Sequence, residues 1–162
     1  MMGRMSTKVL TMGELVPALQ RARASNKRVV FTNGCFDLMH VGHTRYLAAA
    51  KQLGDLLVVG VNSDDSVRAL NKAPGRPVVQ DAQRAEVLAA LESVDYVVVF
   101  SEPDPLNLIT AIQPDVLVKG GDWPVDRIVG RDVVERRGGM VKTIPLVPGA
   151  STTSIIQRIR SI

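Results

Sequence analysis

The chain has 162 residues, of which 46% are hydrophobic and 22% charged, and its formal net charge is +4. This length and apolar content predict one domain over residues 1–162 that buries about two-thirds of its unfolded surface, with a flexible start over residues 1–10. The start has no apolar leader segment, and no run reaches the roughly 18 apolar residues that a membrane span needs, so we expect a cytoplasmic protein with no membrane association.

The basic residues are scattered along the chain, and aromatic residues make up only 4% of it. A nucleic-acid surface normally shows a clustered basic stripe or stacking aromatic residues, so we expect no nucleic-acid partner. The single cysteine, Cys35, excludes an internal disulfide and a cysteine zinc site. Its position between Gly34 and Phe36 favours a buried small hydrophobic residue over a nucleophile.

Strand and helix patterns alternate along the chain. Thr11 and Glu14 form a capping-box pattern that opens a helix ending near Ala24, with Pro17 expected to kink it or delay its start. Strands are expected at 28–31, 56–61, 95–100, 115–118 and 141–144. Later helices are expected at 44–51, 106–112, 132–137 and 154–160. A further helix is expected to begin with Asp81 as its cap and to carry an apolar stripe of Val87, Leu88 and Leu91. This order predicts a Rossmann-like, doubly wound α/β fold with a parallel five-stranded sheet.

The most informative stretch is FTNGCFDLMHVGH, residues 31–43, which lies between the first strand and a helix. Gly34 lets the backbone approach a ligand closely, and a helix start offers free N–H groups to an anion. His40 and His43 are three residues apart, so on one helical turn both imidazoles can donate to the same cluster of phosphate oxygens. The stretch therefore predicts a phosphate site.

Three later segments fall at the edge where parallel strands end and ligands bind. The loop at 71–80 contains Lys72 and Arg76, and its composition fits equally a lid over a phosphate and a plain surface loop. The turn KGGDW ends in Trp123, which either stacks on a ring or packs the loop. The hydroxyl run at 151–153 either caps the last helix or also meets a phosphate. No GxGxxG follows the first strand and GxxxxGK[ST] is absent, so a dinucleotide fold and a P-loop fit less well.

The pattern Gly34-x-Phe36-Asp37-x-x-His40-x-Gly42-His43 resembles the HxGH signature of the nucleotidyltransferase superfamily. With VNSDxS, LVKGGDW and GASTTSII, the chain most resembles the stand-alone form of the adenylyltransferases that transfer AMP from ATP to D-glycero-β-D-manno-heptose 1-phosphate. Their product is ADP-heptose, for lipopolysaccharide core synthesis. The alternative family is the glycerol-3-phosphate cytidylyltransferases, which carry an arginine shortly before their GISTT motif, where this chain has residues 145–148.

The resemblance implies a role for each matching residue. It implies catalytic roles for His40, His43, Lys72 and Arg84. It implies nucleotide or phosphate contacts for Thr32, Asn33, Gly34, Phe36, Asp37, Gly42, Lys119, Gly120, Gly121, Ser151, Thr152 and Thr153. Substrate candidates are Asn62, Asp64 and Asp122. For Asp37, a contact with substrate or metal-bound water stands beside a role in stabilising the turn.

The resemblance also implies partners. These are ATP, a heptose 1-phosphate supplied by a separate heptose kinase, and a second copy of the chain in a homo-oligomer, most simply a dimer. Mg²⁺ is expected to be bound mainly through the ATP phosphates, with no protein metal ligands. Two hypotheses from other classes are a zinc hydrolase with His40 and His43 as ligands, and a nucleotide-binding module without turnover.

Overall fold

Five β-strands and seven α-helices alternate in the computed structural model, which describes residues 7–121 and 123–162. The strands are β1 (Val29–Gly34), β2 (Leu56–Asn62), β3 (Tyr96–Phe100), β4 (Val116–Gly120) and β5 (Met140–Ile144). The helices are α1 (Met12–Ala24), α2 (Val41–Lys51), α3 (Asp64–Ala69), α4 (Asp81–Ala89), α5 (Leu106–Ile112), α6 (Arg131–Arg136) and α7 (Thr152–Arg160), with a 3-10 turn, η1 (Val125–Arg127).

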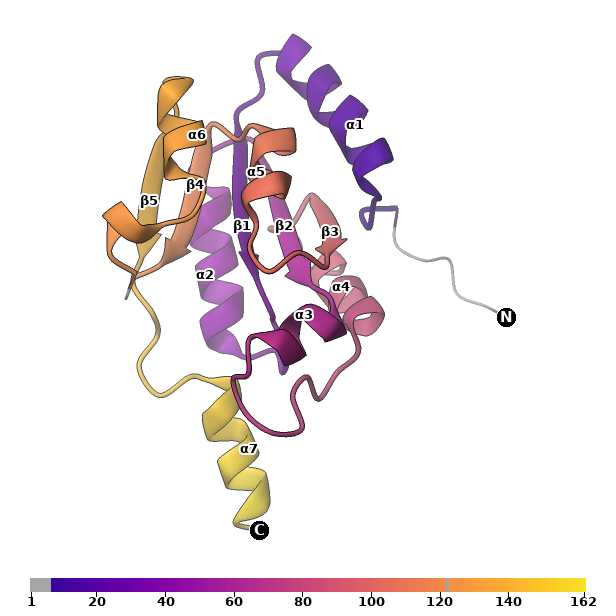
Figure 1. Cartoon of the computed structure of the whole chain (residues 1–162), viewed down its shortest axis with the longest axis vertical. Coiled ribbons are helices and arrows are strands. Elements are labelled where there is room, and N and C mark those ends of the chain that lie inside the picture. Colours follow the sequence, from indigo (N-terminus) through magenta and orange to yellow (C-terminus); the bar gives the residue numbers. More distant parts are fainter. Residues whose placement is uncertain (1–6, 122) are drawn as a thin grey trace.

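The strands form one parallel sheet in the order β3-β2-β1-β4-β5. The chain moves outward from β1 to β3 and then returns to the other side of β1 for β4 and β5 (Figure 1). The predicted doubly wound α/β fold is therefore confirmed. Its topological switch point, where such sheets bind ligands, lies between β1 and β4.

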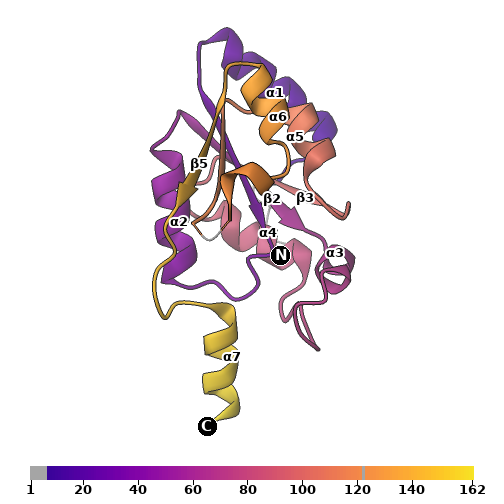
Figure 2. The ribbon, with the colours of Figure 1, turned by 60° about the vertical axis from the view of Figure 1, so that its left-hand side comes forward.

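Helices cover both faces of the sheet, and the strands are apolar on both sides for this reason. Val30 and Leu57 point to the face covered by α2 and α4, whereas Phe31 and Val58 point to the face covered by α1, α5 and α6. Figure 2 shows α1, α5 and α6 together on one side of the sheet and α2 on the other. No helix in the described ranges is long and apolar enough to cross a membrane.

The sheet parts at the switch point. β1 pairs with β2 along its full length, from Val29 to Gly34, but its register with β4 covers only Val30 and Phe31. Residues 32–34 therefore run beside β2 alone, and the carboxyl ends of β1 and β4 separate. This separation opens the crevice in which the site lies.

The start of the chain is more ordered than the sequence suggests. The amide of Val97 donates to the carbonyl of Lys8 and the amide of Leu10 donates to the carbonyl of Val97, both at 2.9 Å. The expected flexible start therefore extends too far, because residues 8–10 pair with the free edge of β3. Residues 1–6 lie outside the described residues.

Helix α1 begins at Met12 without delay, and the capping box between Thr11 and Glu14 is confirmed. Two other helix details differ from expectation. Asp81 is the first residue of α4 rather than its cap, and its carboxylate accepts the amide of Asp64 at 2.9 Å. Val87 is 46% exposed, because α4 turns Arg84 and Leu88 toward the core instead.

Candidate active site

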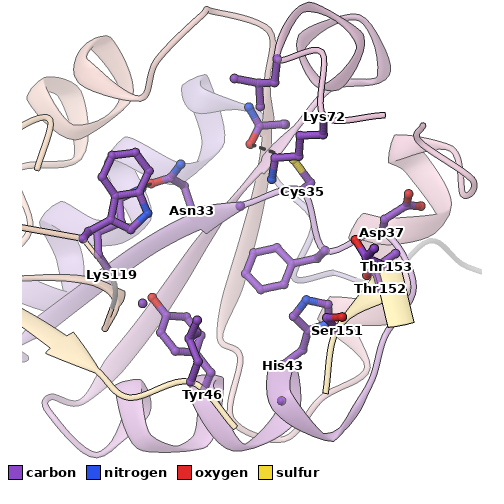
Figure 3. Close-up of a pocket in the computed structure, with 18 of the residues that line it drawn as sticks. Asn33, Cys35, Asp37, His43, Tyr46, Lys72, Lys119, Ser151, Thr152 and Thr153 are labelled. Atoms are coloured by element: carbon purple, nitrogen blue, oxygen red, sulfur yellow. Dashed lines mark hydrogen bonds between the residues drawn. The ribbon is translucent and has the colours of Figure 1, made fainter. Parts of the chain in front are cut away.

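A cavity of about 840 Å³ opens at the carboxyl edge of the sheet. Its walls come from the ends of β1, β2 and β4, the start of α2, the loop after α3, and the segment that leads into α7 (Figure 3). The residues expected from the sequence that line it are Asn33, Gly34, Phe36, Asp37, His40, Gly42, His43, Asn62, Lys72, Lys119, Gly120, Ser151, Thr152 and Thr153. The cavity is therefore formed around the HxGH stretch.

The two histidines lie against each other at the start of α2. Their ring centroids are 3.8 Å apart, and the rings of Phe36 and His43 pack edge to face with their centroids 5.2 Å apart. His40 precedes the helix as its N-cap rather than lying on the first turn, and its Nδ1 accepts the amide of Gly42 at 3.1 Å. Since this nitrogen accepts, the proton of neutral His40 is on Nε2, which is left to donate to a ligand.

Burial makes both imidazoles poor bases. Burial, together with the positive charges of His40 and Lys72, lowers the pKa of His43 to about 4. Burial also lowers the pKa of His40. Near neutral pH the pair therefore offers N–H donors rather than two cations, and an arriving polyanion would raise both pKa values.

Two ammonium groups face the same space. Lys119, on β4, donates to Oδ1 of Asn33 on β1 at 2.5 Å and so bridges the gap between the parted strands. Burial and, to a smaller extent, the charge of Lys72 lower the pKa of Lys119 to about 8. Like charges held together in this way lose part of their repulsion when an anion binds between them, so the electrostatics favour a polyphosphate.

The hydroxyl run before α7 has divided roles. Ser151 is the N-cap of α7 and accepts the amide of Ser154 at 3.0 Å. Thr152 donates to the carbonyl of Leu38 at 3.2 Å and so holds the helix start against the HxGH segment. Thr153 is exposed on the cavity lining. The N-cap interpretation is therefore confirmed for Ser151, and all three residues of the hydroxyl run lie on the cavity lining.

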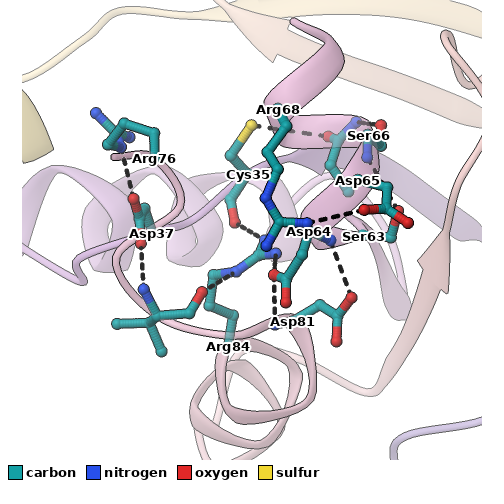
Figure 4. Close-up of polar contacts among 12 residues, drawn as sticks. Cys35, Asp37, Ser63, Asp64, Asp65, Ser66, Arg68, Arg76, Asp81 and Arg84 are labelled. Carbon is teal, nitrogen blue, oxygen red and sulfur yellow. Dashed lines mark hydrogen bonds and ion pairs between the residues drawn. The ribbon is translucent and has the colours of Figure 1, made fainter. Parts of the chain in front are cut away.

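Arg84 does not line the cavity. It is 1% exposed, and its three nitrogens donate to the carbonyl of Val79 at 2.8 Å, the carbonyl of Cys35 at 2.6 Å and Oδ1 of Asp64 at 2.9 Å (Figure 4). Arg84 and Asp64 are thus bonded to each other and neither lines the cavity, so the phosphate clamp expected for Arg84 and the substrate contact expected for Asp64 stay predictions that this geometry does not support. Helix α4 points the guanidinium inward, where it ties α3, α4 and the HxGH segment together.

Two further residues with expected nucleotide contacts, Thr32 and Gly121, also lie outside the cavity lining. Thr32 is fully buried beneath the cavity, where its hydroxyl bonds the carbonyl of Val118 at 3.0 Å and the hydroxyl of Tyr46 at 2.7 Å. Gly121 also lies outside the lining, with its Cα against Pro145. Asp122 lies outside the described residues. Asp37 lines the cavity, but its carboxylate is turned toward the loop at 76–79.

The sequence did not reveal the apolar wall of the cavity. This wall includes Leu70, Pro103, Pro105, Ile128, Val129, Leu146, Val147 and Pro148. Trp123 also faces the cavity and is 57% exposed, so packing of its loop does not account for it. The available signal was the run of prolines and aliphatic residues at 145–148 on the carboxyl edge.

The acidic side chains of the cavity are the groups that could serve as protein ligands of Mg²⁺. Asp37 and Asp104 line it, but both already accept N–H groups of the protein, Asp104 from the amide of Leu106 at 2.9 Å. Within the described ranges no group of three or more acidic, histidine or cysteine side chains converges on one point. This donor set fits an ion held mainly by phosphate oxygens and water.

A parallel sheet with stacked histidines, two lysines and a helix start around its switch point defines a nucleotidyltransferase-type α/β domain. The chain belongs to the cytidylyltransferase-like family, whose model matches residues 31–158.

Among curated relatives, the bifunctional protein HldE of Syntrophotalea carbinolica is 54% identical over 94% of this chain and 31% of its own length. The HldE protein of Geobacter sulfurreducens is 53% identical over 97% of this chain and 32% of its own length. The chain thus spans about a third of the length of these relatives.

Solved structures agree with the fold. The lipopolysaccharide core biosynthesis protein from Thermoplasma volcanium is 29% identical with a TM-score of 0.62, over 75% of this chain and 97% of that chain. Pantothenate synthetase from Thermus thermophilus is 20% identical with a TM-score of 0.58, over 87% of this chain and 62% of that chain, and shares the fold.

The buried position of Arg84 yields a prediction about stability. Arg84→Ala should lower the free energy of unfolding by about 3–5 kcal/mol, because it leaves two carbonyls without their donor and removes the cation paired with Asp64. Arg68→Ala is the matched control, since the Asp65–Arg68 ion pair is exposed and should contribute less than about 1 kcal/mol. Urea unfolding measures both. If the Arg84→Ala protein were as stable as the wild type but unable to bind ATP, Arg84 would be a phosphate-binding residue rather than a structural one.

The depressed pKa of His43 predicts how stability depends on pH. The group titrates near 6.5 in the unfolded chain and near 4 in the folded one, so the unfolded state binds more protons between these values. The free energy of unfolding should therefore fall as the pH is lowered from about 6.5 to about 4. In His43→Gln this slope should be shallower, with His40 supplying the remainder. Equal slopes in the two proteins would show that His43 titrates normally.

Proposed function

We propose that the protein transfers AMP from ATP to D-glycero-β-D-manno-heptose 1-phosphate, giving ADP-heptose and pyrophosphate. The observation that carries this proposal is the convergence of His40, His43, Lys72 and Lys119 on one cavity with the N-terminus of α7. All of these groups favour the charge of a transferring phosphate. The identity of 54% to a bifunctional HldE protein supports the choice of acceptor.

In the proposed reaction an oxygen of the sugar phosphate forms a bond to the α-phosphorus of ATP. The bond from that phosphorus to the bridging oxygen breaks, and pyrophosphate leaves with the electron pair. A phosphate monoester is already ionised near neutral pH, so the step needs no general base. Catalysis then consists of positioning and charge stabilisation.

Each group has a part in this step. Nε2 of His40, with His43 stacked beside it, donates to oxygens of the α-phosphate, which gain charge in the transition state. Lys72 and Lys119 neutralise the triphosphate, and the first amides of α7 bind the phosphate of the acceptor or of ATP. Mg²⁺, bound through the phosphates, would supply further charge neutralisation. Asn62 and the apolar wall are then the groups that contact the nucleoside and the sugar.

The main alternative within the family is transfer of CMP to glycerol 3-phosphate. Cytidylyltransferases with that activity carry an arginine where this chain has the aliphatic and proline residues at 145–148, three of which line the cavity. The zinc hydrolase has less support, because Nδ1 of His40 is occupied by the amide of Gly42. A binding module without turnover would release no pyrophosphate.

The proposed function also involves a kinase that supplies the acceptor, a second copy of the chain and a cellular compartment. A heptose kinase supplies the acceptor, and the family relatives matched over about a third of their length are named bifunctional. The working form is a homo-oligomer, most simply a closed dimer, which light scattering would detect as twice the molar mass. The enzyme acts in the cytoplasm, because its charged substrates do not cross a membrane unaided.

The histidines generate a kinetic prediction. His43→Ala should lower kcat by about 100-fold, equivalent to roughly 3 kcal/mol, because the lost donor acts chiefly on transition-state charge. For His40 the better substitution is His40→Asn, since asparagine is also a good N-cap and keeps α2 intact while removing the imidazole donor. Steady-state pyrophosphate release measures kcat. Unchanged turnover in either variant would remove that histidine from the mechanism.

Substrate choice is tested by four reactions. Pyrophosphate release should be fastest with ATP and the heptose 1-phosphate, and slow with CTP or with glycerol 3-phosphate. A pocket that pairs several hydroxyls disfavours an acceptor that leaves those groups unpaired. If CTP with glycerol 3-phosphate gave the highest kcat/KM, the heptose assignment would be wrong while nucleotidyl transfer would stand.

A further inference from the structure

The carboxylate of Asp37 lies within the HxGH segment, yet it binds a different part of the chain. Asp37 is 3% exposed, and its oxygens accept Nε of Arg76 at 2.5 Å and the amides of Val78 and Val79 at 2.9 Å (Figure 4). Burial alone would raise the pKa of Asp37, but these N–H donors hold the pKa below its usual value. The carboxylate is therefore already saturated by donors of the protein itself.

The two helices that flank the loop at 71–80, α3 and α4, are also joined at their first residues. The amide of Asp64 donates to Asp81 and the amide of Asp81 donates to Asp64, both at 2.9 Å, so the two helix starts are joined. With residues 76–79 fixed by Asp37, the part of the loop without such anchors is 71–75, which contains Lys72. Gly75 lies there in the left-handed region with no atom within 4 Å of its missing Cβ.

Lys72 itself depends on this anchoring for its position. It lines the cavity, and its charge acts on both His43 and Lys119. In the described part of the chain no hydrogen bond or ion pair fixes its ammonium group to a neighbouring residue, so the loop backbone decides where that group lies. Arg76 is only four residues further along.

We propose that Asp37 and Arg76 are positioning residues that clamp the loop at 76–79 and thereby hold Lys72 over the cavity beside His43. The inference rests on the proposed function and assigns Asp37 neither a substrate nor a metal contact. Arg76 also lines the cavity, but its Nε is engaged by Asp37 and its side chain is only 10% exposed, so the inference assigns it to the clamp.

Releasing the clamp would extend the segment without such anchors from 71–75 to 71–78, because the carbonyl of Val79 is still held by Arg84. The number of conformations open to Lys72 grows with that length, and an error of about 1 Å in placing a catalytic group can lower a rate by roughly 100-fold. An asparagine at position 37 has one acceptor oxygen against three N–H groups, and its own NH₂ would face a donor. Asp37→Asn therefore disrupts the clamp without changing the size of the side chain at position 37.

A double-mutant cycle tests whether Asp37 acts through Lys72. Asp37→Asn and Lys72→Ala should each lower kcat by about 10-fold or more with a smaller effect on KM for the acceptor. The double variant should be no slower than the slower single variant, within about twofold. If the two effects multiply instead, Asp37 acts independently of Lys72 and the inference is overturned.

Limited trypsin digestion provides a second readout that does not require activity. Trypsin cuts after Lys72 but not after Arg76, which precedes proline, so cleavage at Lys72 reports the mobility of the loop. Asp37→Asn and Arg76→Ala should be cut at Lys72 at least several-fold faster than the wild type, with Arg76→Lys in between. Arg68→Ala, in the exposed pair on α3, should match the wild type.

The outcomes separate the two proposals. Equal cleavage rates in the wild type and a folded Arg76→Ala protein, whose backbone bonds to Asp37 remain, would overturn the clamp even if Asp37→Asn does not fold. A wild-type protein that releases no pyrophosphate with any substrate pair would refute the proposed function, while accelerated cleavage would still show that the clamp fixes the loop.

Discussion

The parting of β1 from β4 is the constraint on which the site depends. Two parallel strands that stay paired would fill the switch point with backbone, but here pairing ends at Phe31 and Leu117. Side chains then span the gap in place of backbone bonds. Thr32 donates to the carbonyl of Val118, and Lys119 donates to Asn33. The crevice is thus held open at a width set by two hydrogen bonds, with a cation on its floor.

Several groups in this crevice are held in electrostatically unfavourable positions. Burial and neighbouring positive charge depress the pKa values of His43 and Lys119 together. A site of this kind is less stable alone than when it holds a polyanion, so part of the energy of ligand binding comes from relief of repulsion. The protein tolerates this arrangement because the rest of the sheet is apolar on both faces and well covered.

The parts predictable from sequence are those governed by local rules. Helix α5 has the expected bounds of Leu106–Ile112, and the HxGH stretch lies at the cavity as its glycines and histidines indicated. The contacts that the sequence did not indicate join partners far apart in the chain. Arg84 reaches Cys35, 49 residues away, and Asp37 reaches Val79, 42 residues away. A charged residue has the same local pattern whether it faces a ligand or a buried partner, so only the packed structure separated these roles.

The bond from Thr152 to Leu38 joins residues 114 positions apart. A contact between such distant segments carries a large loop-closure entropy and tends to form after local structure. One wall of the cavity therefore depends on the step of folding that is hardest to reach. We therefore expect the sheet to form before this contact, so that nucleotide added during refolding would stabilise only molecules in which the contact has been made. In this way the ligand would report the end of folding rather than its beginning.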